Sequence, residues 1–432
     1  MFHKRAILIG IHKVFLEGFI YRNTLKLKCA IMENADTHQE WRFWPVIILA
    51  FFYPVNNALI NLAIPLYFFK EGISIEMIGV IAAGAAITYA FSPILFRKVS
   101  EKLGRKKSII LGISGALSSQ LIFYFTLHPI PFLIARMMEG LLMGFFWINL
   151  QSSISDNALH DHSKMMSRYN IAWNSGLLVG NLIGAIFLFV IDNVELIFYI
   201  APIFFAINVF IAILFFKESA KIDLDSSLEV RESENHKNNK SSNLELTAYY
   251  IPIIIPVILI IAFSVSKASV MFLYPIKSET LNFESYTVYL LVFFCILAQL
   301  IGTASATYFS IKNLKRIPLV CIISLIIVLM IYGLTTDFST FFMLFLLLGF
   351  FCGLLYGFSL KLTIILNMKE NTSKYSSLLE SIIGTGFLVT PITCGFIAGI
   401  GLNSAFYIIS IVLILQLIIS IIYIRKIVEI KD

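Results

Sequence analysis

The sequence predicts an all-α membrane protein whose twelve transmembrane helices form two six-helix bundles related by pseudo-symmetry. Three observations predict this class. Hydrophobic residues make up 58% of the 432 residues and charged residues only 14%, whereas about 25% of the residues in a typical soluble domain are charged. Apolar runs of about 20 residues, the length of a membrane-spanning helix, recur without the two-residue alternation of a β-barrel. Lysine and arginine are concentrated in alternate connectors between these runs.

The apolar runs divide the chain into two sets of six. A polar segment at 217–248, which we expect to be a mobile linker, separates an N-terminal bundle, 43–216, from a C-terminal bundle, 249–424. A segment at 1–42 precedes the first bundle, and a tail at 425–432 follows the second. We expect the spans at 43–68, 74–96, 108–127, 130–152, 168–190, 194–216, 249–273, 285–309, 317–334, 338–362, 376–399 and 402–424.

The positive charge is distributed unequally between the two sides of the membrane. Lys70 and Lys277 are assigned to connectors on one side, and Arg136 and Lys267 lie inside spans, whereas the other lysines and arginines all fall on the opposite side. Because positively charged connectors stay in the cytoplasm, both termini are predicted to be cytoplasmic in a multi-pass protein of the cell membrane. The net charge of +7 is therefore interpreted as a topology signal and not as a nucleic-acid footprint.

The N-terminal segment allows two interpretations. Its interrupted apolar stretch, RAILIGIHKVFLEGFIYR, is predicted to be neither a signal peptide nor a span, and it could lie on the membrane surface as an amphipathic helix. Alternatively, translation begins at Met32, which we favour.

The two bundles contain similar short sequences at nearly constant separation. LLMGFF at 141–146 recurs as LLLGFF at 346–351, and SRYN at 167–170 recurs as SKYS at 373–376. Each pair falls on corresponding spans of the two bundles. A duplicated six-helix unit is typical of secondary transporters, in which the substrate site lies between the halves near the membrane midplane.

The connector RKVSEKLGRKK resembles the signature between the second and third helices of the major facilitator superfamily. In that pattern a Gly is followed by three residues, Asp, Arg or Lys, any residue, Gly, Arg, and Arg or Lys. Here Glu101 replaces the Asp, and Lys102, Gly104, Arg105 and Lys106 match the remainder, whereas Arg97 occupies the place of the first Gly.

Two further sequences resemble elements of the same superfamily. RMMEGLLMG is similar to its Arg-x-x-Gln-Gly element, with Arg136 and Glu139 at the first and fourth positions. GLLVGNLIGA is similar to the glycine-rich element of the drug/proton antiporters; Gly176, Gly180 and Gly184 match it, and Asn181 and Ala185 replace the expected Pro and Gly. The resemblance implies a monomeric secondary transporter in the lipid bilayer that exports amphipathic or drug-like compounds in exchange for protons.

Other functions are weighed against this one. Uptake of a sugar or an organic acid by a symporter or uniporter stays open, because the antiporter motif lacks its Pro and several spans carry amide side chains. A membrane-embedded enzyme or a channel is not expected, because no convergent catalytic residues, metal-ligand spacing, nucleotide-binding motif or charged pore ring is visible. No cofactor and no metal site are predicted.

The connector is expected to act as a conformational gate. Gly104 permits a turn that places Glu101, Lys102 and Arg105 at the cytoplasmic ends of the helices. Glu380, near the cytoplasmic start of the eleventh span, is the predicted partner across the two halves, and the resulting contact would favour the outward-open state. The alternative is that the loop only sets topology.

Polar side chains inside spans are candidates for the substrate cavity, because burying them in lipid is costly. The predicted set consists of Asn57, Asn61, Arg136, Glu139, Trp147, Asn174 and Lys267, and Asn170 and Asn181 share the face of Asn174. Lys267 either reaches the cavity or extends to the outer surface. Glu139 is predicted to couple transport to protons; the alternative is a permanent ion pair with Arg136.

Overall fold

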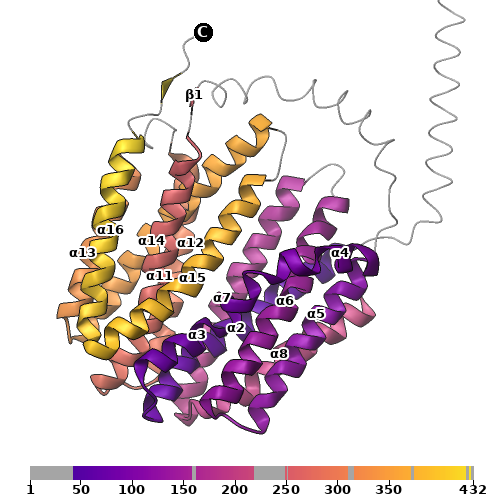
Figure 1. Cartoon of the computed structure of the whole chain (residues 1–432), viewed down its shortest axis with the longest axis horizontal. Coiled ribbons are helices and arrows are strands. Elements are labelled where there is room, and N and C mark those ends of the chain that lie inside the picture. The colour runs from indigo at the N-terminus through magenta and orange to yellow at the C-terminus, as the bar shows by residue number, and fades with distance from the viewer. Residues whose placement is uncertain are drawn as a thin grey trace, which may run out of the picture.

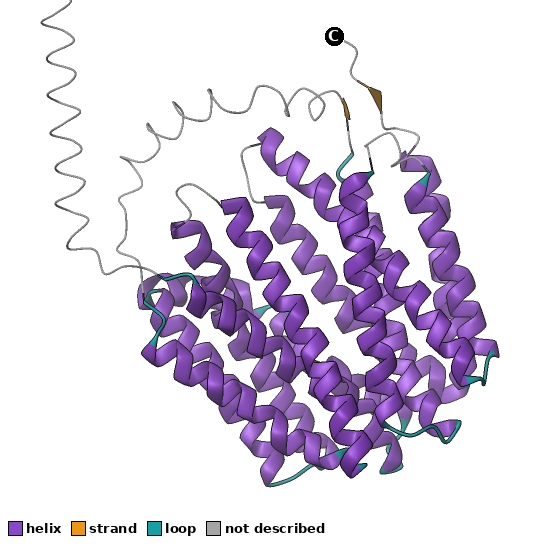
Figure 2. Cartoon of the chain, turned by 180° about the vertical axis from the view of Figure 1, so that it is seen from behind, coloured by secondary structure: helices purple, strands orange, loops and turns teal. Residues whose placement is uncertain are grey.

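The computed structural model describes residues 42–157, 162–217, 249–250, 252–309, 316–370, 374–424 and 428–429. These residues are almost entirely helical (Figures 1 and 2). Nearly all of segments 1–42 and 217–248, and most of the tail, lie outside the described residues, as does the question of the translation start. The helices are α2 (Trp44–Lys70), α3 (Ile75–Tyr89), α4 (Ser92–Leu103), α5 (Arg105–Gln120), α6 (Pro129–Asn157), α7 (His162–Ile191), α8 (Glu195–Leu214), α11 (Ile254–Thr280), α12 (Tyr286–Tyr308), α13 (Ile317–Leu334), α14 (Phe338–Glu370), α15 (Lys374–Ile400) and α16 (Leu402–Ile424).

The predicted fold class is confirmed. Among the described helices, ten are long and apolar enough to cross a membrane. The second and third predicted spans are occupied by two shorter helices, α3 and α5, and α5 is extended by a 3-10 turn at Leu121–Tyr124. In Figure 1 the first six spans, from indigo to magenta, gather on one side and the last six, from salmon to yellow, on the other.

The second predicted span, 74–96, is too long. The α3 helix ends at Tyr89, and the separate helix α4 begins at Ser92. Pro93 explains the break, because its ring would clash with the carbonyl group four residues earlier, which is that of Tyr89, and it has no N–H to donate. Proline is tolerated in the first turn of a helix, which is where it stands in α4.

The α4 helix lies across the end of the N-terminal bundle (Figure 1). It packs on α6 through stacked rings of Phe96 and Phe145, whose centroids are 4.3 Å apart, and through a 2.8 Å hydrogen bond from Ser100 to Asn149. The turn predicted at Gly104 is confirmed: its φ of 83° and ψ of 167° separate α4 from α5. This conformation is essentially restricted to glycine.

The seventh predicted span begins five residues too early. The α11 helix starts at Ile254, and Tyr249–Tyr250 forms a short strand, β1, that pairs antiparallel with β2 (Val428–Glu429). The end of the linker and the tail of the chain therefore lie together. We call this end of the molecule, where α8 ends and α11 begins, the linker face, and the other end the opposite face.

Close helix packing is achieved where glycines meet a neighbouring backbone. A Cβ added to Gly176 or Gly180 of α7 would lie 2.2 Å from the carbonyl oxygen of Phe51 or 2.6 Å from that of Val55, both in α2. These glycines therefore let α7 and α2 pack closely.

At the opposite face, Asp337 caps the start of a helix. The side chain of Asp337 accepts hydrogen bonds from Ser339 and from the backbone N–H of Thr340, at 2.7 and 2.9 Å. These bonds cap α14 and hold the pKa of the exposed Asp337 carboxyl group below its usual range.

Lys277, assigned from the sequence to a connector, is instead buried in α11.

Candidate functional site between the two halves

The two halves meet through α3 with α15, α7 with α12, and α2 with α11. At the opposite face, the Lys70 ammonium group at the end of α2 donates a 2.7 Å hydrogen bond to the Ser285 hydroxyl and lies 3.4 Å from a carboxylate oxygen of Glu279. These contacts join the last turn of α2 to the residues around the α11–α12 connection. We call Lys70, Glu279 and Ser285 the outer latch.

The crossing of α3 with α15 and the crossing of α7 with α12 both lie toward the opposite face. Near the start of α3, a Cβ on Gly79 would lie 2.5 Å from the carbonyl oxygen of Pro391 in α15. Near the end of α7, Gly184 faces the ring of Tyr289, and the Tyr289 hydroxyl donates to the carbonyl oxygen of Leu59 in α2. The halves are therefore packed closely at the opposite face.

Toward the linker face, an exposed carboxyl group lies between the two halves. Glu380, on the seventh residue of α15, is exposed. It interacts electrostatically with Tyr89 of α3 and Tyr169 of α7 in one half, and with Tyr356 of α14 in its own half. Because its neighbours come from both halves, its side chain lies between them and not on the outer surface. A water-accessible space therefore reaches Glu380.

The predicted gate residues lie at the linker face. Glu101 and Lys102 are exposed on α4, and Arg105, at the start of α5, donates a 3.2 Å hydrogen bond to Asn149 of α6. In this conformation Glu380 makes no ion pair with the described residues and interacts electrostatically with Tyr89, Tyr169 and Tyr356. Its pairing with the connector stays a prediction for another conformation.

Arg136 and Glu139 form a buried ion pair within α6. Their side chains are 2% and 1% exposed, and Nη1 of Arg136 lies 2.7 Å from Oε2 of Glu139. The same carboxylate oxygen accepts a 3.1 Å hydrogen bond from Gln120 of α5. Gln120 exchanges two hydrogen bonds with Asn56 of α2, at 2.8 and 3.0 Å, and Nη2 of Arg136 donates to Asn61 of α2 at 2.9 Å. We call these five residues the polar network.

Only one member of the polar network is accessible. Asn61 is exposed, whereas Asn56, Gln120, Arg136 and Glu139 are buried. The sequence predicted three of the five members; it missed Asn56 and Gln120, although both are amides inside apolar runs and that signal could have found them. In this conformation Arg136 and Glu139 connect α5, α6 and α2 and are not surfaces for a substrate.

An aromatic cluster lies beside the network. The ring of Trp147, 9% exposed, is 4.7 Å from that of Tyr53 and 4.6 Å from that of Trp173, both edge to face. Tyr53 also interacts electrostatically with Glu139 and with Tyr89, so the cluster connects the polar network to the tyrosines around Glu380.

The predicted asparagine face of α7 is only partly accessible. Asn170 is exposed and Asn174 is half-buried, with its side-chain N–H bonded to the Asn170 carbonyl at 2.8 Å. Asn181 is 2% exposed, so the prediction that it faces the cavity is wrong. Its side chain bends back to the carbonyl of Leu177. Asn57 of α2 is half-buried.

Lys267 lies at the middle of α11. Its ammonium group donates a 2.6 Å hydrogen bond to Gln299 of α12 and lies 5.6 Å from the centre of the Phe263 ring. The alternative in which Lys267 extends to the outer surface is wrong, because Gln299 holds it within the C-terminal half.

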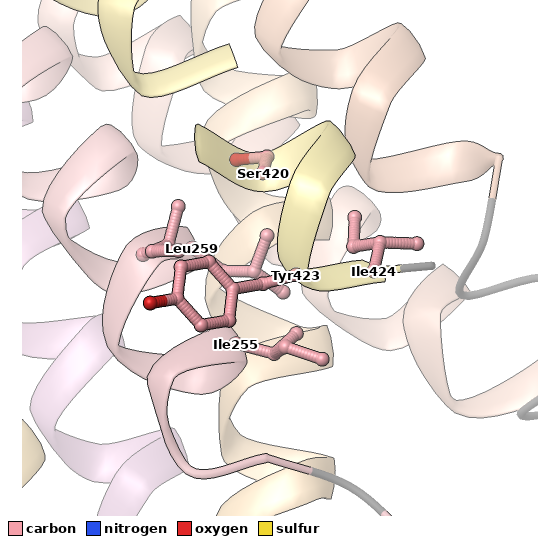
Figure 3. Close-up of a pocket in the computed structure, with 6 residues that line it drawn as sticks. Ile255, Leu259, Ser420, Tyr423 and Ile424 are labelled. Atoms are coloured by element: carbon pink, nitrogen blue, oxygen red, sulfur yellow. The ribbon is translucent and has the colours of Figure 1, made fainter. Parts of the chain in front are cut away.

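A small pocket between α11 and α16 offers no comparable chemistry. Figure 3 shows the ring of Tyr423 beside Ile255 and Leu259, and Ser420 nearby. The lining contains no charged side chain. Both helices belong to the C-terminal half, and the lining includes no residue of α15 or of the N-terminal half.

The comparison with protein families identifies the fold. Residues 46–365 match the model of the Major Facilitator Superfamily. The chain belongs to this superfamily. It is therefore a multi-pass membrane transporter, as the connector motif implied.

Individual relatives are distant. A staphyloferrin B transporter of Staphylococcus aureus is 27% identical over 130 residues, which span 30% of this chain and 31% of that protein. A bacterial homolog of the human lysosomal transporter Spinster, in an inward-facing and unoccupied conformation, is 13% identical with a TM-score of 0.68 over 88% of this chain and 95% of its own. The D-xylose-proton symporter is also 13% identical, with a TM-score of 0.66 over 90% and 97% of the two chains. These structures share the fold.

Proposed function

We propose that this transporter exports a small amphipathic organic solute in exchange for protons, by alternating access. The observation that carries the proposal is the asymmetry between the two faces: the halves are packed together at the opposite face, while Glu380 between them is exposed toward the linker face. If the linker face is cytoplasmic, as the lysine and arginine distribution predicts, this conformation is open inward.

The side chains between the halves support an amphipathic solute and a proton. Trp147, Trp173 and Tyr53 supply aromatic surface, and Glu380 supplies a titratable group that water reaches. Glu139 is the second candidate for proton coupling. Its carboxylate is held by Arg136 and Gln120, so Glu139 can exchange a proton only in a conformation that opens the polar network.

Uptake of a sugar or an organic acid is the second candidate function. It is favoured by the accessible amides of α2 and α7, namely the exposed Asn61 and the half-buried Asn57 and Asn174. Amide groups donate and accept hydrogen bonds and therefore suit hydroxyl-rich solutes.

Flux into proteoliposomes under an imposed pH gradient distinguishes these functions. The solute panel contains ethidium, its uncharged aromatic core phenanthridine, D-xylose and staphyloferrin B. We expect a pH gradient to drive an aromatic solute in the direction opposite to the protons. If D-xylose alone moves, and moves with the protons, uptake is the function; if no solute responds to the gradient, the proposal of proton-coupled transport is refuted.

Alternating access is tested by locking the outer latch. Lys70→Cys and Ser285→Cys place two thiols where the side chains now touch, and the native cysteines in the described part of the chain are buried. Joining the two thiols with a short reducible reagent should abolish flux, and reduction should restore it. Each single-cysteine variant, treated in the same way, is the matched control. Unchanged flux in the joined protein would show that the opposite face does not need to open.

A further inference from the structure

The space between the halves contains Glu380 together with three tyrosines. We propose that Glu380, with the half-buried Tyr89 and Tyr356, binds the positively charged nitrogen of an amphipathic organic cation, so that organic cations are the solute class of this transporter; Tyr169, 4% exposed, belongs to the cluster but offers no ligand surface. The inference rests on the proposed function and assigns a recognition role to this cluster.

The four side chains form one cluster built from both halves. Tyr169 interacts electrostatically with Glu380, Tyr89 and Tyr356 at the same time, which places all four close together. They come from four helices: α3 and α7 of the first half, and α14 and α15 of the second. A ligand held here therefore touches both halves.

Within the described part of the chain, Glu380 makes no ion pair and no hydrogen bond, whereas three cations of the described spans have partners. Lys267 is bonded to Gln299, and Lys361 donates to the carbonyl oxygens of Thr307 and Phe309 at 3.3 and 2.7 Å. Arg136 is paired with Glu139.

Among the residues whose side chains the structure describes, Arg168 is the cation next to the cluster in sequence. It precedes Tyr169 on α7 and is exposed. Successive residues of a helix point about 100° apart, so Arg168 does not share the direction of Tyr169. The charge that the cluster offers to a ligand is negative.

The cluster has room beside it. Gly384 lies one turn beyond Glu380 on the same face of α15, and a Cβ added there would meet no atom within 4 Å. On the other side, Tyr89 adjoins Tyr53 and, through it, Trp147 and Trp173. A flat aromatic body can occupy this space while its cationic nitrogen is near Glu380.

Two physical effects favour a cation at this position. A carboxylate without an ion-pair partner attracts any cation that approaches it. The faces of tyrosine rings attract the same cation through their quadrupoles. A neutral solute of the same shape obtains only the apolar contacts, and an anion is repelled.

Binding of ethidium to the purified full-length protein, measured by equilibrium dialysis, tests the inference. We expect Glu380→Gln to weaken binding at least tenfold and Glu380→Asp to weaken it much less, because the aspartate restores the charge. Glu284→Gln, an acid-to-amide change in the exposed α11–α12 connection, is the matched control and should change nothing. Phenanthridine should bind the wild type and Glu380→Gln equally. Gly384→Leu, which fills the space while retaining the charge, should weaken binding of both probes.

Three results would overturn the inference: no ethidium binding by the wild type, equal binding by Glu380→Gln, or equal loss of ethidium and phenanthridine in that variant. If Glu380 serves only as a gate, Glu380→Gln would alter the flux of every solute to the same extent and leave ethidium binding unchanged. That result refutes the cation site and leaves proton-coupled transport intact. A failure of the proposed function is recognised separately, by the absence of any flux that responds to the pH gradient.

Discussion

Glu139→Gln is the most informative single change, because it separates a structural role of the buried pair from a role in proton coupling. The variant keeps the shape of the side chain and removes its charge. Arg136 then loses its anionic partner but retains its hydrogen bond to Asn61, and its Nε has no hydrogen-bond partner in the described part of the chain.

The geometry sets the expected magnitude. The pair is 2.7 Å apart and almost completely inaccessible. Breaking such a pair by removing one partner costs about 3–5 kcal/mol. The introduced amide can still accept from Arg136, so we expect a loss of stability toward the lower end of that range, which is large compared with the roughly 5–15 kcal/mol of a typical protein.

Thermal unfolding of the detergent-purified variant, together with its abundance in membranes, measures this loss. The double variant Arg136→Met, Glu139→Leu removes both charges and fills similar volumes, so it should regain much of the stability. Its recovery distinguishes an unpaired buried charge from a general packing defect. If Glu139→Gln is as stable as the wild type, and transports solute without responding to a pH gradient, the structural reasoning is refuted and Glu139 is the proton-coupling residue.

Three further predictions concern the faces of the molecule. A cysteine at Ser227, in a cysteine-free background, should react with an impermeant reagent only after cells are permeabilised; labelling of intact cells would reverse the topology. Gly104→Ala should slow transport without loss of insertion, because a non-glycine residue in this conformation costs about 1–3 kcal/mol, and normal transport would show that the turn only sets topology. Lys70→Met and Glu279→Gln should each raise the labelling rate of a cysteine on the opposite face no more than about fivefold, since a partly exposed pair contributes about 0–1 kcal/mol. The double variant should show no additional increase; additive effects would refute a shared latch.

The fold was predictable because the length of an apolar run is set by the thickness of the bilayer. Helix ends were less predictable. Pro93 stands inside an apolar stretch that reads as one span, whereas the structure ends α3 at Tyr89 and begins α4 at Ser92. Lys277 shows another limit. It was assigned to a connector because it is charged, yet it is 4% exposed and donates to the carbonyl of Gly333 and the side chain of Asn403, at 3.2 and 3.1 Å.

The site was predicted in part because a polar residue inside a span needs a partner or a water-filled space, but the sequence does not say which. Arg136 and Glu139 form an ion pair one helical turn apart, as their spacing in the sequence allows. Asn56 and Asn57 are neighbours in sequence but differ in burial: Asn56 is buried against Gln120, and Asn57 is half-buried. Whether Glu380 would face Arg105 or the tyrosines depends on the conformation, which a local sequence pattern does not encode.

The internal duplication has a consequence for how the halves move. The second helix of each half packs against the fifth helix of the other, as α3 with α15 and α12 with α7. The two crossings differ in detail: at the first, the backbone of Gly79 approaches the backbone of Pro391, whereas at the second the ring of Tyr289 fits against Gly184. A backbone contact between small residues lets helices rotate past each other, but a tyrosine ring held by the carbonyl of Leu59 resists sliding. When the opposite face opens, we therefore expect the α3–α15 crossing to move first and the α7–α12 crossing to act as the pivot.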